Sequence, residues 1–431
     1  MSGPAPAPAA TALPGTKFFA PQARVVRQDG QPLTIGDQSV GQDLISLTVT
    51  QPGNGVGQVE LTLNNQRFGT PNPQTPAWKY NGLDQSEVSF GTRFRVDLRY
   101  GQDRWTPMML ARVTNVAFGF PSAAGASVTI TGEDLLSLLK AKPNHPVLHF
   151  SIHEIDMVES EAAFSGCGLT VVPPDPRNLF SSPMGDVTHE PAQSYLQFIQ
   201  SMADRMDYEV FVEFDDAGAP LPGDGATEVI PKLYFGPARS AVLGDPIPLA
   251  WGLDIIEFKP SFKVWDMFTA ARVAGNVPRG RGSITVDVPM ADAIEGDLHA
   301  APGQPAPLTA IDVRHRAFET ELTFLTNMVG DEIEANVSTI NVTNIDEERA
   351  ERQGLAALRK SAREFLTAEI TTIGYTRLRP GIHVNLTGLY APFDGIYYVT
   401  QAVHTLSATG YTTKISVRRP GMLDPSSYPG G

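Results

Sequence analysis

The sequence predicts a mainly β protein of the α+β class, with two β-rich units, an α/β segment between them and one long helix in the C-terminal half. Apolar and polar residues alternate with a period of two from Lys17 to about residue 131 and again over residues 381–418. Helical spacing is found only between these two stretches. Glycine and proline are also abundant, at 39 and 36 of 431 residues, which favours many turns over long helical rods.

The first β-unit is expected to be a meander of half-buried strands. Val59, Leu61 and Leu63 alternate with polar residues, as strands with one buried face require. The Asn54-Gly55 pair precedes this segment and can supply the positive φ angles of a tight hairpin. A short helix over residues 132–140 is expected to close the unit, because its leucines share one face.

Two amphipathic helices are predicted in the segment that follows. Ser151 and Glu154 form a capping-box pattern that predicts a helix over residues 152–165, and Gly166 offers a stop. Pro191 suits the first turn of a second helix. Apolar residues then recur at spacings of three and four, at Tyr195, Ile199, Met202 and Met206. The strands YEVFVEF and KLYFG come next and predict a hairpin with a long tip.

The second β-unit is interrupted by a region of different texture. Alternating segments at residues 251–274 and 381–418 predict its strands, while residues 276–310 are rich in glycine and proline. A strong helix is predicted near residues 345–368. Acidic residues occupy its start and basic residues its end, which suits the helix dipole, and an apolar stripe would face the core.

The predicted organisation has three structured parts and two tails. They are a disordered tail (1–16), a first β-domain (17–146), an α/β segment (147–240), a second β-domain (241–422) with an inserted loop and helix (276–368), and a short tail (423–431).

Charge and cysteine content exclude several classes of protein. The formal net charge is −14 at pH 7, whereas a dedicated nucleic-acid-binding protein carries a basic excess. Cys167 is the only cysteine, so no internal disulfide is possible and folding in a reducing compartment is expected. No run of 18 apolar residues is present, and the N-terminus lacks the pattern of a secretory signal. We therefore expect no sequence-specific nucleic acid partner and no membrane-spanning segment.

The sequence offers no clear catalytic, cofactor-binding or metal-binding pattern. The glycine run at residues 53–57 resembles a phosphate loop, but no Lys-Ser or Lys-Thr pair follows it. His383, His404 and Asp394 are the only conceivable catalytic set, and no serine or cysteine occupies a recognisable nucleophile turn. Both histidines are expected to be structural. We predict no enzymatic activity, no cofactor and no metal.

The C-terminal run LRPGIHVNLTGLYAPFDGIYYVTQAVHTLSATGYTTKISVRR resembles the closing region of the late control D family, the baseplate hub proteins of contractile phage tails. It is also similar to the N-terminal hub part of type VI secretion VgrG spike proteins. The matching elements, in order, are Pro380-Gly381, Gly388, the Phe393–Tyr397 turn and strand, His404, and Gly410-Tyr411-Thr412. The order of the preceding helices and strands extends the resemblance over most of residues 20–420. The long region 276–344 departs from it.

This resemblance implies a structural hub in which each chain contributes two similar β-barrel domains. Three chains would form a ring of six domains that adapts a sixfold inner tube to a threefold spike. The implied partners are two further copies of the chain, an inner tube or tube-initiator protein, a spike protein that is a separate polypeptide, and other baseplate (wedge) proteins. Such a protein would assemble in the bacterial cytoplasm and become part of a phage virion tail or an injection-system particle.

The residues expected to matter structurally are four glycines at turns or bulges and three ring-bearing strand residues. They are Gly381, Gly388, Gly395, Gly410, Tyr397, His404 and Tyr411. Two other functions stay open on the sequence alone. One is a particle-associated cell-wall hydrolase that uses the two histidines, and the other is a monomeric β-rich sugar-binding module.

Overall fold

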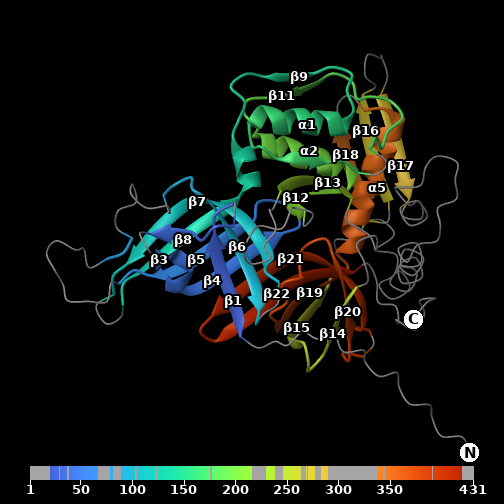
Figure 1. Cartoon of the computed structure of the whole chain (residues 1–431). Helices are drawn as coiled ribbons and strands as arrows, with labels where there is room; N and C mark the ends of the chain where they lie inside the picture. Colours follow the sequence, from blue (N-terminus) through green and yellow to red (C-terminus); the bar gives the residue numbers. More distant parts are fainter. Residues whose placement is uncertain are drawn as a thin grey trace, which may run out of the picture.

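A computed structural model of the chain confirms the mainly β class. It describes residues 20–28, 30–35, 38–66, 78–80, 89–101, 104–121, 125–174, 177–215, 230–237, 246–263, 268, 270–276, 283–289, 337–342, 345–390 and 392–419. The two predicted tails and most of the region 276–344 lie outside these residues. In Figure 1 the two β-units lie side by side, with the α/β segment above them. Within the described part of the chain, every helix is too short or too polar to cross a lipid bilayer.

Twelve strands from both β-units form one hydrogen-bonded sheet. Its main path runs β1–β6–β7–β8–β5–β4 through the first unit and continues β21–β22–β19–β15 through the second, with β20 beside β21 and β14 beside β20. The first unit contains β1 (Pro21–Val26), β4 (Leu44–Pro52), β5 (Gln58–Asn64), β6 (Arg93–Tyr100), β7 (Thr106–Gly119) and β8 (Ser127–Asp134). The second contains β14 (Ile247–Ala250), β15 (Ile255–Phe262), β19 (Leu366–Ile373), β20 (His383–Thr387), β21 (Gly395–Ser407) and β22 (Gly410–Arg419).

The expected closure of each unit into a barrel is not found among the described strands. Closing the first unit would require β4 to pair with β1. Instead, the edge of β4 that β5 leaves open pairs with β21 of the other unit. Two shorter pieces complete the first unit, the ribbon β2 (Thr34–Ile35) with β3 (Gln38–Ser39) and the 3-10 turn η1 (Val40–Asp43).

The apolar residues of the alternating pattern form the core of the first unit. Val59, Leu61 and Leu63 of β5 are each at most 1% exposed and pack against buried residues of the neighbouring strands. The loop 53–57 joins β4 to β5 and is longer than the tight hairpin expected. The predicted helix over 132–140 is the 3-10 helix η2 (Leu135–Lys140), because its first residues continue β8 and Asp134 caps it.

The α/β segment packs two helices against short strands. The helices are α1 (Glu154–Ser165) and α2 (Tyr195–Met206). The strands are the ribbon β9 (Val147–His149) with β11 (Val187–His189), and the sheet β10 (Thr170–Val172), β13 (Ile230–Pro237) and β12 (Tyr208–Asp215). The antiparallel pairing of β12 with β13 confirms the predicted hairpin.

Both helices of this segment start later than the sequence patterns suggest. The Ser151 capping box is wrong, because Ser151 has a φ of 49° and α1 begins after His153, which makes no side-chain cap bond. Gly166 ends α1 in the left-handed region, as predicted. The second helix does not open at Pro191, because Ser194 and Gln197 form a complete capping box that starts α2 at Tyr195.

The second unit carries a small additional sheet that α5 (Glu347–Arg363) covers. Its strands are β16 (Ala270–Asn276), β17 (Ser283–Pro289) and β18 (Val337–Val342), with β16 in the middle. Figure 1 shows α5 alongside these strands. The helix ends before the predicted residue 368, because Leu366 already begins β19.

Candidate functional site

The two β-units join along β4 and β21, and several of the predicted residues gather at this junction. The antiparallel register runs from Leu47 opposite Leu406 to Pro52 opposite Gln401. His404 lies opposite Val49, within the joined segment. The junction is therefore a backbone ladder as well as a packing contact, which makes it far more specific than two touching domains.

His404 is a buried histidine with both ring nitrogens bonded inside the protein. It is 1% exposed, its Nε2 donates to the carbonyl of Leu378 at 2.9 Å, and its Nδ1 accepts from the hydroxyl of Tyr411 at 2.8 Å. Since a carbonyl can only accept, the proton resides on Nε2. Burial and then the charge of Arg379 lower the pKa of His404 to about 3, so the ring is neutral near pH 7.

Tyr411 belongs to β22 but packs in the core of the first unit. Its ring centroid lies 5.7 Å from that of Tyr100, whose hydroxyl donates to the carbonyl of Gly374 at 2.8 Å. A Cβ atom on Gly374 would lie 2.1 Å from Cδ1 of Tyr411, so only glycine leaves room for this ring. Burial raises the pKa of both tyrosines, which keeps their hydroxyls protonated as donors.

Sequence reasoning missed Tyr100 and Gly374. The bond between them spans 274 positions, and neither residue carries a local pattern that points to the other. Their role is visible only once β6 and the end of β19 lie together.

The loop 53–57 contacts all three parts of the molecule. The amide of Gly53 donates to the carbonyl of Thr400 at 2.7 Å, and that of Gly55 donates to the carbonyl of Val210 at 3.0 Å. The amide of Gly57 donates to Asp134 at 2.7 Å. This glycine run is therefore a structural connector between the three parts.

Buried polar groups also tie the α/β segment to the second unit. Glu209 of β12 accepts from the hydroxyl of Tyr398 and from the Arg418 guanidinium, the latter at 3.0 Å. Burial raises the pKa of Glu209, and Arg418 and Tyr398 oppose that rise. Arg363 at the end of α5 donates to Asp207 at 2.7 Å. These bonds link the α/β segment to β21, β22 and α5.

The four predicted glycines all have φ angles in the positive region. The angles are 86° at Gly381, 82° at Gly388, 133° at Gly395 and 121° at Gly410. Gly410 is the first residue of β22 and directly follows the turn from β21, where a Cβ atom would meet nothing within 4 Å. The backbone conformation alone therefore demands glycine at this turn.

The remaining predicted residues occupy structural positions in the second unit. Tyr397 is fully buried, and its hydroxyl donates to the carbonyl of Phe393 at 2.8 Å. Asp394 accepts the amide of Leu389 at 2.7 Å and holds the turn before β21. Asp394 and His404 are thus committed to separate structural bonds, and the ring of His383 packs on Tyr398. This arrangement offers no exposed base beside an aligned acid.

Comparison with known proteins gives structural but not sequence matches. No protein-family model matches the chain, and no curated protein matches it by sequence. A tail protein from Neisseria meningitidis MC58 is 14% identical, with a TM-score of 0.57 over 95% of this chain and 99% of that one. The 43 kDa tail protein of prophage MuSo2 from Shewanella oneidensis is 13% identical, with a TM-score of 0.56 over 94% and 100%.

A third similar structure comes from a secretion system. A chain of the Francisella PdpA-VgrG complex is 8% identical, with a TM-score of 0.51 over 95% of this chain and 53% of that one. The present chain therefore spans about half of that protein. These likenesses confirm, at the level of the fold, the resemblance read from the sequence: the chain has the fold of phage tail and VgrG-like proteins.

Proposed function

We propose that this chain is the structural baseplate hub of a contractile phage tail or contractile injection system. Three copies would form a ring that adapts a sixfold inner tube to a threefold spike. The observation that supports this most strongly is the fold shared with two tail proteins, one of them from a prophage, over almost the whole length of all three chains. Because fold alone does not determine function, the arrangement of the site must be consistent with the same role.

The junction supports a role in symmetry matching. Each copy carries two β-units that are continuous through the β4–β21 ladder, so three copies present six units in a ring. The contacts between neighbouring copies in such a ring would be heterologous. The ring closes with three copies only if each copy is rotated by one third of a turn from the previous one. The partners would be an inner tube or tube-initiator protein, a separate spike protein and wedge proteins. The protein would assemble in the bacterial cytoplasm and act within the particle.

A structural rather than an enzymatic role is also part of this proposal. The predicted histidines serve the fold, and His404 is closed off from solvent. The two tail proteins of similar structure also favour a structural role. A cell-wall hydrolase has no observation in its favour at this site.

Native mass spectrometry of the full chain over a concentration series tests the proposal. We expect a species of three chains that persists on dilution, and three copies at the lower end of the tube in particle images. A chain that stays monomeric at the highest concentration, and remains monomeric when tube and spike proteins are added, would contradict it. Glycan binding by such a monomer would favour the sugar-binding module.

A further inference from the structure

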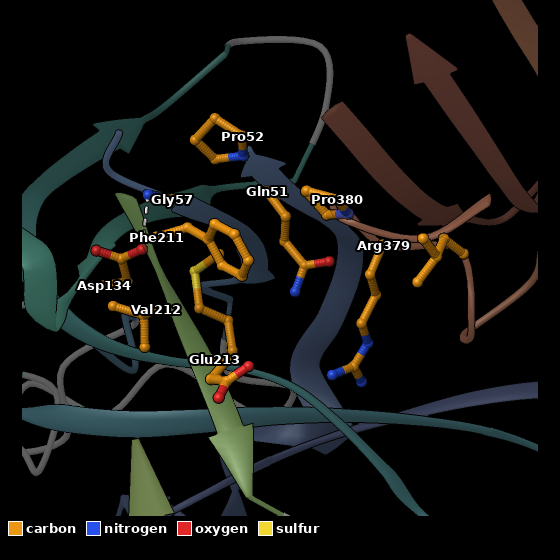
Figure 2. Close-up of a pocket in the computed structure, with 11 residues that line it drawn as sticks. Gln51, Pro52, Gly57, Asp134, Phe211, Val212, Glu213, Arg379 and Pro380 are labelled. Carbon is orange, nitrogen blue, oxygen red and sulfur yellow. Dashed lines mark hydrogen bonds between the residues drawn. The ribbon is translucent and has the colours of Figure 1, made fainter. Parts of the chain in front are cut away.

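A pocket of 240 Å³ lies where the two β-units and the α/β segment meet (Figure 2). Its volume is far above the ~10–15 Å³ that a single water molecule needs. The polar residues on its wall come from four separate places in the chain. They are Gln51 of β4, Asp134 of β8, Glu213 of β12 and Arg379 from the connection between β19 and β20.

Hydrogen-bond acceptors dominate this wall. Asp134 is 5% exposed, and its two oxygens accept the amides of Gly57 at 2.7 Å and Leu136 at 3.0 Å, which leaves further lone pairs on both oxygens. The buried Oε1 atom of Gln51 has no hydrogen-bond partner among the described residues, while its amide nitrogen donates to the carbonyl of Met108 at 2.5 Å. Glu213 adds a second carboxylate.

Among the described residues, the carboxyl group of Asp134 accepts two backbone amides and forms no ion pair with a cationic side chain. Burial raises its pKa to about 7, the two backbone amides and Lys140 counter this only in part, and Glu133 adds to it. Lys140 itself pairs with Glu133 at 2.9 Å. Arg379 lies on the opposite side of the view in Figure 2 and donates to the carbonyl of Pro107. A cation entering the pocket would therefore stabilise the ionised form of Asp134.

The rest of the wall is apolar and includes Met109, Phe211 and Ile382. Acceptors combined with apolar walls suit an aliphatic stem that ends in a cationic head. A bare metal ion fits less well, because the described residues contain no cluster of three or more His, Cys, Asp or Glu side chains that could hold one. We propose that this pocket binds the side chain of a lysine or arginine that a partner protein contributes, with its cationic head at Asp134.

The pocket is complete within one copy, so the test does not depend on the proposed trimer. Full-length protein labelled with ¹⁵N at glycine is titrated with n-butylguanidine, which reproduces an arginine side chain, and in parallel with the neutral isostere n-butylurea. We expect n-butylguanidine to shift the Gly57 amide signal saturably. We expect n-butylurea, which has no positive charge, to bind at least about tenfold more weakly, a difference of about 1.4 kcal/mol in binding free energy. Equal binding of the two compounds, or no shift with either, would overturn the proposal.

Two variants and one change of pH sharpen this result. Asp134→Asn should reduce the affinity for n-butylguanidine at least about tenfold, whereas Asp156→Asn on the exposed face of α1 should leave it unchanged. If Asp134→Asn does not fold, Gln51→Met removes the unpartnered acceptor at similar size and should weaken binding several-fold. The affinity for n-butylguanidine should also increase from about pH 6 to about pH 8, because the Asp134 carboxyl group loses its proton over this range. Glu213 and Arg379 are the other charged groups that line the pocket. Unchanged affinity in Asp134→Asn, unchanged affinity in Gln51→Met where Asp134→Asn does not fold, or binding that does not change with pH would overturn the assignment.

Discussion

His404 shows how a single buried side chain can make the whole fold sensitive to acid. The pKa of His404 is about 3 in the folded chain and 6.5 in the unfolded chain. Between these two pH values the imidazole is protonated in the unfolded state and neutral in the folded state. The stability that this residue contributes is complete above pH 6.5 and is lost as the pH falls toward 3. The slope is at most about 1.4 kcal/mol per pH unit.

His404→Gln removes this titration, so the variant should lose less stability than the original chain between about pH 7 and about pH 5. Urea unfolding at both pH values measures the difference. His145→Gln, at an exposed position, is the matched control and should follow the original chain. Parallel pH curves for the original chain and His404→Gln would refute the role of the buried ring.

Gly374 offers a second prediction at the same scale. Gly374→Ala should destabilise the protein by about 1–3 kcal/mol, because the new Cβ atom would lie 2.1 Å from the Tyr411 ring. Gly119→Ala in β7 is the control, since there the Cβ would meet the rotatable hydroxyl of Ser127 at 3.0 Å and the carbonyl oxygen of Ser127 at 4.0 Å. In a Tyr411→Ala background the cost of Gly374→Ala should shrink, as expected for residues in contact. Strictly additive costs would show that the two residues do not collide.

At the scale of elements, one carboxylate ties the β9–β11 ribbon to the helix α1. Glu161 is fully buried and bonds His149 Nε2 at 2.6 Å and His189 Nδ1 at 2.8 Å, one residue from each strand of the ribbon. The ring of Phe198 on α2 stacks on His189 with centroids 4.5 Å apart. The ribbon is therefore held to both helices through its two histidines.

Glu161→Ala should cost about 3–5 kcal/mol, because it leaves two buried imidazoles without their shared partner. Hydrogen exchange should rise in β9 and β11 before it rises in the large sheet. Glu159→Ala on the same helix removes only an exposed ion pair with Arg177 and should cost less than about 1 kcal/mol. Similar losses in both variants would mean that the ribbon does not depend on Glu161.

The elements also show which sequence patterns are informative. The helical stripe Tyr195, Ile199, Met202 and Met206 is entirely buried, as its spacing predicts. Helix starts were less predictable, since Ser151 and Ser194 both carry an N-cap pattern and only the surrounding structure decides which serine has the extended backbone that a cap needs. The periodic spacing of apolar residues predicts a buried helix face because many residues contribute to it. An N-cap depends on the backbone conformation of a single residue, which the local sequence does not determine.

At the scale of the whole molecule, the two β-units should unfold together. The β4–β21 ladder and the contact between Tyr100 and Tyr411 make each unit part of the other's environment. Hydrogen exchange in rising urea should therefore show β5 and β22 losing protection at the same concentration, and Gly374→Ala should shift both equally. Two separate transitions would show that the junction adds little cooperativity.

The junction marks the limit of what the sequence alone predicts. Alternation in β5 and the turn at Gly410 are local, so both could be read directly. The pairing of β4 with β21, the open sheet and the role of Gly374 depend on residues far apart in the chain. Alternation and the resemblance to hub proteins both predicted two β-units, but neither revealed which strands link them.

The β4–β21 ladder has a consequence for synthesis. A nascent chain exposes the open edge of β4 until the ribosome has added everything up to β21, which takes tens of seconds at ~5–20 residues per second. During that interval the edge can pair with the same strand of a neighbouring nascent chain on the polysome. Slow translation would thus favour aggregation, and a chaperone that covers this edge would raise the yield of folded protein.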